Sequence, residues 1–414
     1  MKIFRELPGH LQLIACDVLI VGGGPAGSVA AILLARGGAR VLLVERSRYD
    51  VAGRGEMLPP AAIQQLRRLN LAACLDGCSV PCTGLVTHWG ATLSEVDYLF
   101  NPLGEGAILA RPRFDAALCI HAASTGAEVL TETNIRSCVL ADSGYWDAVL
   151  RNRGGETRVH AVQLIDAAGR KNWPGRPSPE RRRFDRLVAI VAHFRMPSNL
   201  QPDPRPIIEA NPGGWCYSSI FPGGNRVVLV FTDIDLIVRC AQGLQFVWEE
   251  ALQCSPRTAE SIDGAARVCA LRVIAADTSQ RRSFAGKNWL AAGDAAATWD
   301  PLCAAGIFNA ISHAEQTAAV ILHGSPPSDV QAYRDKLRAD FETYRKGYRY
   351  YYGIVRRFPH SPFWQRRAQR LIPRRTSSVK PIVLPSSETD ETRKEDSAFT
   401  VASICAAPKS LLNR

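Results

Sequence analysis

Short and long apolar runs alternate along the first part of the chain. Residues 17–21 form a short run rich in β-branched side chains, residues 25–35 form a longer apolar run, and residues 41–44 form a second short one. A short β-branched run bounded by glycines is typical of a buried strand, and a longer apolar run is typical of a helix. The pattern predicts a strand, a helix and a second, parallel strand, as in a doubly wound α/β sheet.

The same kinds of run return further along the chain. Residues 135–165 hold three strand-like segments, which are broken by the turn-forming residues 142–144 and 152–155. Residues 245–253 have the pattern of a helix, and residues 335–357 predict a long helix that carries many basic and aromatic side chains. The chain therefore mixes helices with strands over most of its length.

The order of these elements predicts an α/β fold made of two interleaved units. One is a Rossmann-like unit, and the other is an antiparallel β-sheet unit whose main strands are residues 187–194 and 225–232. A helical region follows, and the last segment is rich in Ser, Pro and mixed charge, so we expect a flexible tail. The expected boundaries are 16–79, 108–183 and 285–330 for the Rossmann-like unit, 80–107 and 184–284 for the sheet unit, 331–375 for the helical region and 376–414 for the tail.

The turn between the first strand and the first helix has the glycine spacing of a dinucleotide site. Gly22-x-Gly24-x-x-Gly27 lies there, and Glu45 ends the second strand. Gly22 permits the tight turn, Gly24 lets the backbone approach a pyrophosphate, and Gly27 lets the helix pack closely on the sheet. The helix N-terminus attracts phosphates, and Glu45 can accept a hydrogen bond from a ribose hydroxyl. On this motif alone, the ligand is FAD or NAD.

Residues 18–35 allow a second interpretation, a membrane span. These eighteen residues carry no charge, which is close to the shortest length that crosses a bilayer. Three glycines and a proline in the middle of the stretch argue against a helix exposed to lipid. We therefore expect no membrane span.

Composition narrows the function further. The chain has 414 residues and a formal net charge of +11, which is concentrated in Arg181–Arg183 and residues 334–375. This charge can steer an anionic substrate or an acidic partner, and no nucleic-acid recognition module accompanies it. The N-terminal segment lacks the order of a signal peptide, so we expect a cytoplasmic protein with reduced thiols. Cys74, Cys78 and Cys82 are interpreted as packing thiols, and we expect no metal site.

Three later segments carry a resemblance to a known family. Residues 164–170 and 289–297 predict strands that end in small-residue turns, and residues 300–310 enter a helix. In this order they resemble the FAD-dependent monooxygenase superfamily, which also holds the flavin-dependent halogenases. The resemblance implies that Asp294 binds the flavin ribityl chain and that residues 301–306 lie beside the flavin pyrimidine ring. A helix N-terminus there would stabilise the negative charge of the reduced ring.

Two more segments are similar to the same superfamily. Residues 111–118 resemble its Arg-x-x-Phe-Asp helix start, which implies that Arg111 lies near the flavin or its phosphates. Residues 53–60 resemble its Gly-Glu-x-x-x-Pro segment, which implies that Glu56 lies near the isoalloxazine. A capped, exposed arginine and a solvated loop acid are the simpler alternatives. The residues expected to bind FAD are Gly22, Gly24, Pro25, Ala26, Gly27, Glu45, Arg46, Arg54, Arg111, Ala168, Gly293, Asp294, Pro301, Ala305, Gly306 and Ile307.

A narrower resemblance concerns the reaction. Gly-Trp-x-Tyr-Ser at residues 214–218, Phe-Thr-Asp at 231–233 and the aromatic segment 358–367 resemble the flavoproteins that mature tryptophylquinone enzymes. That group implies O2-dependent hydroxylation of a tryptophan side chain in a partner polypeptide, through a flavin C4a-hydroperoxide. A second GxGxxG motif is missing, so electrons would come from docking NAD(P)H or from a separate flavin reductase. The candidate catalytic or positioning residues are Glu56, Asp300, Trp215 and Tyr217.

Other reactions remain open at this point. A small-molecule aromatic hydroxylase of secondary metabolism would share every FAD motif, and a reductase or a flavoprotein that only binds a partner would share most of them. Halogenation is disfavoured for two reasons. Tryptophan halogenases carry Trp-x-Trp-x-Ile-Pro where this chain has Trp215-Cys-Tyr217, and they use a lysine in the N-terminal third to carry the activated halogen. This chain has no lysine between Lys2 and Lys171.

Overall fold

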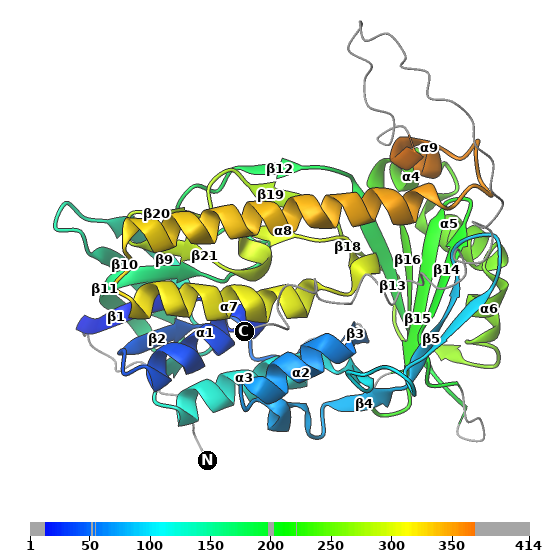
Figure 1. Ribbon diagram of the computed structural model, residues 1–414. Coiled ribbons are helices and arrows are strands. Elements are labelled where there is room, and N and C mark those ends of the chain that lie inside the picture. Colours follow the sequence, from blue (N-terminus) through cyan, green and yellow to red (C-terminus); the bar gives the residue numbers. More distant parts are fainter. Residues whose placement is uncertain (1–12, 51–52, 54, 198–202, 221, 369–414) are drawn as a thin grey trace, which may run out of the picture.

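Two large β-sheets stand side by side in the computed structural model, and one long helix, α8, extends from the first to the second (Figure 1). The structure describes residues 13–50, 53, 55–197, 203–220 and 222–368. Arg54 and the expected tail, residues 376–414, lie outside the described residues. The mixed α/β fold predicted from the sequence is confirmed.

The first sheet has the parallel core that the glycine motif predicts. Its order is β20-β21-β11-β1-β2-β8, and β11 also extends through an antiparallel meander with β10 and β9. Four side chains of β1, from Val18 to Val21, are buried, because helices or the meander cover both faces of this sheet. Its strands are β1 (Leu13–Val21), β2 (Val41–Val44), β8 (Glu128–Leu130), β9 (Asn134–Leu140), β10 (Trp146–Asn152), β11 (Gly155–Asp166), β20 (Ala285–Gly286) and β21 (Trp289–Ala291).

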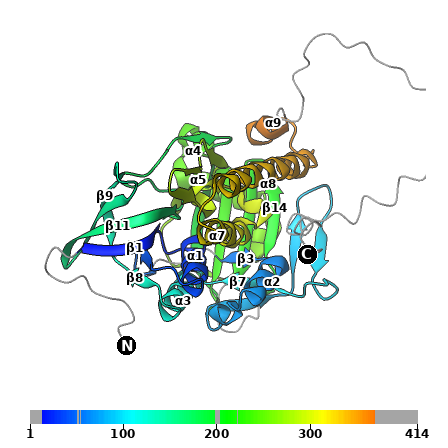
Figure 2. The same cartoon turned by 60° about the vertical axis from the view of Figure 1, so that its left-hand side comes forward.

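Helices cover one face of this sheet in a stack. Figure 2 shows α7 lying between α1 and α8, and the buried side chains of α1, α3 and α7 form one continuous apolar core with the sheet. Small residues of α1 such as Ala30 and Ala31 are fully buried, which lets the helices approach closely. The helices are α1 (Pro25–Arg36), α2 (Pro60–Arg68), α3 (Arg111–Ser124), α7 (Gly306–Leu322) and α8 (Pro327–Gly353), with a 3₁₀ turn η1 (Ala72–Leu75).

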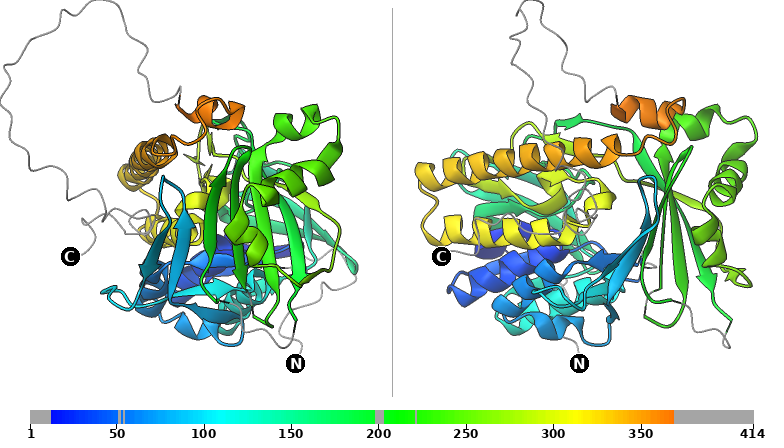
Figure 3. Two further views of the ribbon diagram at one scale, coloured as in Figure 1. Left: turned by 90° about the vertical axis from the view of Figure 1, so that its right-hand side faces the viewer. Right: turned by 45° about the vertical axis from the view of Figure 1, so that its right-hand side comes forward.

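The second large sheet is mainly antiparallel, as the sequence predicted. Its order is β17-β13-β16-β15-β14-β5-β6, and β18 also pairs with β13. Helices α4, α5 and α6 lie on its outer side, while the other side faces the first sheet (Figure 3). The elements are β5 (Gly84–His88), β6 (Ser94–Asp97), β13 (Leu187–Arg195), β14 (Ile207–Asn211), β15 (Gly214–Ile220), β16 (Arg226–Asp233), β17 (Ala266–Arg267), β18 (Arg272–Ala275), α4 (Ile234–Arg239), α5 (Gly243–Gln253) and α6 (Pro256–Glu260).

Two three-stranded sheets complete the fold. One has the order β3-β7-β4 and the other β12-β19-β22. Two 3₁₀ turns precede α7, and a short helix, α9, follows α8. The elements are β3 (Glu56–Leu58), β4 (Ser79–Cys82), β7 (Gly106–Leu109), β12 (Arg181–Arg183), β19 (Ser279–Arg281), β22 (Ala297–Thr298), η2 (Gly293–Ala295), η3 (Pro301–Cys303) and α9 (Pro362–Ala368).

Several local predictions can be compared with these elements. The three strands in residues 135–165 and the helix at 245–253 are confirmed. The long helix predicted at 335–357 exists, but its bounds were wrong: it begins at Pro327, where a proline suits the first helical turn, and ends at Gly353. Residues 18–35 belong to both β1 and α1, so the alternative of a single membrane helix is wrong. Across the described residues, no helix combines the length and apolar character needed to cross a bilayer.

The three cysteines weighed as a metal site do not share one environment. Cys74 and Cys78 are buried in the core of the first sheet, and the Cys78 thiol donates to the Cys74 carbonyl at 2.9 Å. Cys82 lies in the core beside the second sheet. Burial raises the pKa of Cys78 and of Cys82 to about 11. Buried, protonated thiols in two cores agree with the packing interpretation.

A buried ion cluster joins the first sheet to the β12-β19-β22 sheet. Asp166, the last residue of β11, accepts from Arg176 Nε and from Arg281 Nη1, each at 2.6 Å. The three side chains are at most 3% exposed. Because two guanidinium groups share one carboxylate away from water, the cluster depends on Asp166.

We predict that Asp166→Asn lowers the free energy of unfolding by about 3–5 kcal/mol, because it leaves two buried guanidinium groups without a counter-charge. Urea denaturation followed by circular dichroism measures this loss. Asp17→Asn is the matched control, since the pair of Asp17 with Arg40 is exposed and its loss should change stability little. Equal effects of the two substitutions would contradict the role assigned to Asp166.

Candidate functional site

The turn before α1 has the geometry of a phosphate site. Gly22 has φ +108°, and a Cβ there would collide with the backbone of Ala167, so only glycine fits. Gly24 is the N-cap of α1 and no side chain caps the helix. A Cβ on Gly24 would meet no protein atom within 4 Å. A pyrophosphate placed at this uncapped N-terminus could accept from backbone N–H groups of the first turn of α1.

Other predicted residues of this turn are buried. Pro25, Ala26 and Gly27 lie in the first turn of α1, and Ala26 is only 5% exposed. A Cβ on Gly27 would meet the carbonyl of Gly22, so this glycine serves the helix–strand contact. Gly22 thus serves the turn and Gly27 the packing of the helix on the strand, and Gly24 stays the residue predicted to let a ligand approach.

Glu45 shapes the neighbouring loop. Its Oε2 accepts from Gly23 N and its Oε1 from Ser47 N, both at 2.7 Å. Each carboxylate oxygen has a further lone pair that could accept from a ribose hydroxyl. Arg46 is exposed beside it. The sequence analysis missed Tyr49, whose hydroxyl donates to Gly23 O at 2.8 Å from a backbone with φ +61°.

Hydrogen bonds with the side chains of His313 and Arg181 fix the backbone of the Gly293-Asp294 turn. Gly293 N donates to Nδ1 of His313 on α7 at 3.1 Å, and burial lowers the pKa of His313 to about 4, so the ring is a neutral acceptor. Arg181 donates to the carbonyls of Asp294 and Ala295 at 2.9 and 3.2 Å. The Asp294 side chain stays 41% exposed, with Arg170 Nε at 3.4 Å from its Oδ2. Asp294 is therefore open to a ligand while its backbone is fixed.

The segment between Asp300 and α7 leads into a second helix N-terminus without a side-chain cap. Pro301 begins η3, Ala304 has φ +47°, and α7 begins at Gly306 after the N-cap Ala305, without a side-chain cap. A Cβ on Gly306 would meet nothing within 4 Å. Ile307 is buried in the helix core. The start of α7 is thus a second helix N-terminus without a side-chain cap, whereas Ile307 contributes packing. Ala168 lies at the turn after β11, where its N–H donates to Asp166 at 3.2 Å.

Asp300 is a fully engaged buried carboxyl group. Its Oδ1 accepts from Leu302 N at 2.9 Å, and its Oδ2 accepts from the Tyr352 hydroxyl at 2.8 Å. Its own N–H donates to the Tyr344 hydroxyl at 2.8 Å. Burial raises the pKa of Asp300 to about 7, and the nearby Asp185 adds to the rise. These contacts give Asp300 a positioning role: it caps the Pro301 turn and binds Tyr352, which describes it better than a base in contact with substrate.

Glu56 and Arg111 lie close together. Arg111 Nη1 is 3.6 Å from Glu56 Oε1, and both side chains are 26% exposed. Arg111 also makes two 2.9 Å bonds to Asp115 in the first turns of α3, and it interacts electrostatically with Asp294. Tyr217 is near enough to interact with Glu56 in the same way. The structure therefore brings Glu56 and Arg111 together, and the charge of Asp294 helps to raise the pKa of Arg111.

The second sheet holds the segment that leads into Glu56. The hydroxyls of Tyr217 and Ser219, both on β15, donate to Gly55 O at 2.7 and 3.0 Å. His193 Nε2 on β13 lies 2.7 Å from Gly53 O. Gly55 has φ +63° and a Cβ there would collide with Ser219. Tyr217 is thus a positioning residue, and the sequence analysis missed Ser219 and His193.

Trp215 is placed differently from its predicted role. Its side chain is 1% exposed, its ring stacks on Phe231 at 3.8 Å between centroids, and its Nε1 donates to Tyr352 at 3.0 Å. Because the indole is enclosed by the core, it supports Tyr352 and Asp300 and is not available to touch a substrate.

The residues present fit FAD. Two helix N-termini without caps, at Gly24 and Gly306, lie on the same stack of helices, and the exposed carboxylate of Asp294 precedes the second one. Open space at both glycines suits a pyrophosphate at one end and a flavin ring at the other. Among the described residues, no group of three His, Cys, Asp or Glu side chains could hold a metal ion.

Comparison with known proteins gives the family. A family model for the FAD binding domain matches residues 15–324, and the chain therefore belongs to this family. It is an FAD-dependent oxidoreductase, with the fold shared by flavin-dependent halogenases and monooxygenases.

Individual relatives differ in reaction. The chain is 25% identical over 362 residues to a 1H-pyrrole-2-carbonyl-[peptidyl-carrier protein] brominase of Pseudoalteromonas luteoviolacea, covering 83% of this chain and 88% of the relative. The solved chondrochloren halogenase superposes with a TM-score of 0.78 at 22% identity, over 86% of each chain. A peptidyl tryptophan dihydroxylase essential for tryptophylquinone cofactor biogenesis superposes with a TM-score of 0.70 at 23% identity, over 85% of this chain and 78% of that one.

These comparisons confirm the resemblance to the monooxygenase and halogenase superfamily. They do not single out the tryptophylquinone flavoproteins, because halogenases are at least as similar to this chain. At such identities the structural likeness establishes the fold, and the reaction has to be argued from the side chains.

We predict that Gly24→Val weakens FAD binding at least about tenfold while the free energy of unfolding without FAD changes by less than about 1 kcal/mol. The backbone at Gly24 is unstrained and its surroundings are open, so only a ligand would meet the new side chain. Titration of flavin fluorescence and thermal unfolding measure the two quantities. Gly90→Val, at another open glycine, is the control and should leave both unchanged. Unaltered FAD affinity in Gly24→Val would contradict the site.

We predict that wild-type protein loses roughly 3 kcal/mol of stability relative to Asp300→Asn between pH 5 and pH 8. The pKa of Asp300 is raised from 3.8 to about 7, so its favourable contribution is complete below 3.8 and is lost as the pH rises through 7. The asparagine keeps the shape of the side chain but does not titrate. Urea denaturation at both pH values measures the difference, and parallel pH profiles for the two proteins would show that Asp300 does not titrate in this range.

Proposed function

We propose that this enzyme uses FAD and O2 to hydroxylate an aromatic ring, and that the ring is a tryptophan side chain of a partner polypeptide. One oxygen atom of O2 becomes bonded to a ring carbon and the other leaves as water, while the ring loses a proton. The two electrons and accompanying protons come from NAD(P)H or from a separate flavin reductase. When bound, FAD would supply the activation of O2.

The main support for the proposal is the type of charged side chain expected beside the flavin ring. Glu56 and Arg111, which would lie there, are 3.6 Å apart, and the chain has no lysine between Lys2 and Lys171. Tryptophan halogenases, which belong to the superfamily that the chain resembles, use a lysine in this part of the chain to carry the activated halogen. A carboxylate can instead accept the proton that an aromatic carbon loses on hydroxylation. This difference favours hydroxylation, even though several relatives are halogenases.

The surrounding side chains would orient Glu56 and exclude water. Tyr217 and Ser219 fix the carbonyl of Gly55 directly before Glu56, and Arg111 holds the carboxylate from the start of α3. Behind them the second sheet presents a packed core that contains Trp89, Trp215 and Tyr352. A site closed by apolar side chains protects reactive oxygen species from water.

Two of the compared proteins support a macromolecular substrate. By their names, the brominase acts on a pyrrole carried by a peptidyl-carrier protein, and the dihydroxylase acts on a peptidyl tryptophan. Both substrates are nitrogen heterocycles attached to a protein. The net charge of +11 would steer an acidic polypeptide toward this chain. The second candidate, hydroxylation of a free small aromatic, shares the same site chemistry.

The test is turnover resolved by mass. The enzyme receives FAD, an NADH-driven flavin reductase, O2 and bromide, and a tryptophan-containing polypeptide from its gene neighbourhood, free tryptophan and a small phenol are offered separately. We predict a gain of one or two oxygen atoms on the polypeptide alone. Glu56→Gln should lower the rate at least about tenfold with FAD still bound, whereas Glu260→Gln, an exposed acid on α6, should not.

Each other outcome selects another reaction. Oxygen on the phenol with the polypeptide untouched would assign the enzyme to small-molecule hydroxylation. Bromine on any substrate would overturn the argument from the missing lysine. Consumption of NADH without O2 uptake, with a reduced organic product, would indicate a reductase.

A further inference from the structure

The charged side chains of α8 differ between its first and second parts. In the first part acids and bases form pairs, which join Lys336 to Asp340, Arg338 to Asp335 and Arg345 to Glu342. Glu342 is the last acid of the helix, and residues 346–368 contain six Lys or Arg and no Asp or Glu. The second part of α8 therefore carries positive charge that the helix itself does not balance.

Three of these six cations bind residues outside α8. The pairs are Arg357 with His88, Arg366 with Asp235, and Arg367 with Asp233. The other three are Lys346, Arg349 and Arg356. Within the part of the chain that the structure describes, their side chains have no ion-pair or hydrogen-bond partner.

Two of the unpaired cations share one face of α8 with exposed apolar side chains. Lys346, Arg349, Tyr350 and Ile354 have the spacing i, i+3, i+4 and i+8, which places them on one side of a helix. Tyr350 is 53% exposed and Ile354 is 38% exposed. We call these four residues the outer strip, and Arg356 follows just beyond the end of the helix.

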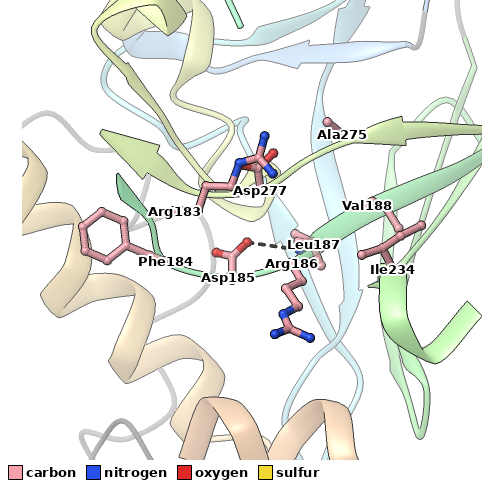
Figure 4. Close-up of a pocket in the computed structure, with 9 residues that line it drawn as sticks. All are labelled: Arg183, Phe184, Asp185, Arg186, Leu187, Val188, Ile234, Ala275 and Asp277. Atoms are coloured by element: carbon pink, nitrogen blue, oxygen red, sulfur yellow. Dashed lines mark hydrogen bonds and ion pairs between the residues drawn. The ribbon is translucent and has the colours of Figure 1, made fainter. Parts of the chain in front are cut away.

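The opposite side of α8 is fixed to the core and to the candidate site. Tyr344 accepts from Asp300 N and Tyr352 donates to Asp300 Oδ2, both at 2.8 Å. Phe341 packs on Phe184, at the wall of the pocket drawn in Figure 4, with 5.2 Å between ring centroids. The outer strip is therefore separated from the Asp300 turn by about the 10 Å diameter of one helix.

Helix stabilisation does not account for the outer strip. Cations stabilise a helix dipole from the last turn, and α8 has no basic residue there. A solvated face usually carries charges of both signs, as the first part of α8 does. Protein interfaces are instead enriched in Arg and aromatic side chains and poor in Asp and Glu. The composition of the outer strip is that of a binding surface.

We propose that the outer strip docks an acidic segment of the polypeptide substrate. Lys346 and Arg349 bind its carboxylates, and Tyr350 and Ile354 contact its apolar groups. The helix rises about 12 Å from Lys346 to Ile354, which is the length of about four residues of extended chain. That the bound polypeptide is also the substrate rests on the proposed function, whereas the binding itself does not.

The test measures peptide binding apart from turnover. The full chain loaded with FAD is titrated into a fluorescein-labelled peptide in which a tryptophan follows about four glutamates, and fluorescence anisotropy gives the affinity. At about 0.1 M ionic strength, charges more than about 10 Å away are screened, so nearby cations decide the result. Lys346→Gln with Arg349→Gln should weaken binding about tenfold. The same peptide with glutamines for glutamates should bind more weakly to the wild-type protein.

Lys336→Gln with Arg338→Gln is the matched control. It removes the same net charge from the same helix but breaks only ion pairs at the surface, so the affinity should not change. An equal loss in both double variants would overturn the proposal, because binding would then follow net charge alone. Tighter binding of a single-stranded oligonucleotide than of the acidic peptide would overturn it as well.

A second measurement does not depend on a variant. A carbodiimide joins an amine directly to a carboxylate in contact with it, so the wild-type protein should couple the acidic peptide to Lys346. If Lys346 instead couples to acids of this chain, such as those in residues 388–396, the strip binds that segment and the proposal is wrong.

Turnover separates this proposal from the proposed function. In the mass-resolved assay, Lys346→Gln with Arg349→Gln should raise KM for the acidic peptide and leave kcat unchanged. An oxygenated peptide with the same KM in this variant would overturn the docking site and leave hydroxylation intact. A peptide that binds through the outer strip without gaining oxygen would support the docking site and contradict the proposed function.

Discussion

The buried carboxyl group of Asp300 is the constraint on which the site depends most. Three hydrogen bonds tie this one residue to Leu302 and to the hydroxyls of Tyr344 and Tyr352. They join the turn before α7 to the aromatic face of α8, and Tyr352 in turn accepts from Trp215 on β15. The start of α7, which should lie beside the flavin ring, is thereby fixed to the second sheet through side chains that exclude water.

A second set of hydrogen bonds joins the second sheet to the segment that precedes Glu56. Tyr217, Ser219 and His193 of the second sheet bind the carbonyls of Gly53 and Gly55, directly before Glu56. The same sheet thus positions both the acid beside the expected ring and, through Asp300, the helix start opposite it. This explains how two units that interleave along the chain can form a single site. The second large sheet, which would carry the substrate, would therefore also support the cofactor site.

Much of the fold and of the phosphate site could be predicted, because their signals are local. The glycine spacing, Glu45 and the three strands of residues 135–165 each lie within a few tens of residues. The remaining contacts join distant positions: Tyr217 meets Gly55 across 162 residues, and Tyr352 meets Asp300 across 52. No spacing rule reports such pairs. The resemblance made Trp215 a candidate catalytic or positioning residue, but its burial between Phe231 and Tyr352 makes it a core residue.

The central claim is that FAD lies along α1 and α7 with its ring between the start of α7 and Glu56. A crystal structure of the protein with FAD tests it most directly. The account predicts the pyrophosphate on the backbone at Gly24, the ribityl chain on Asp294 and the ring edge against residues 304–306, with Glu56 and Arg111 on its open side. A flavin ring out of contact with both the start of α7 and Glu56 would contradict the account.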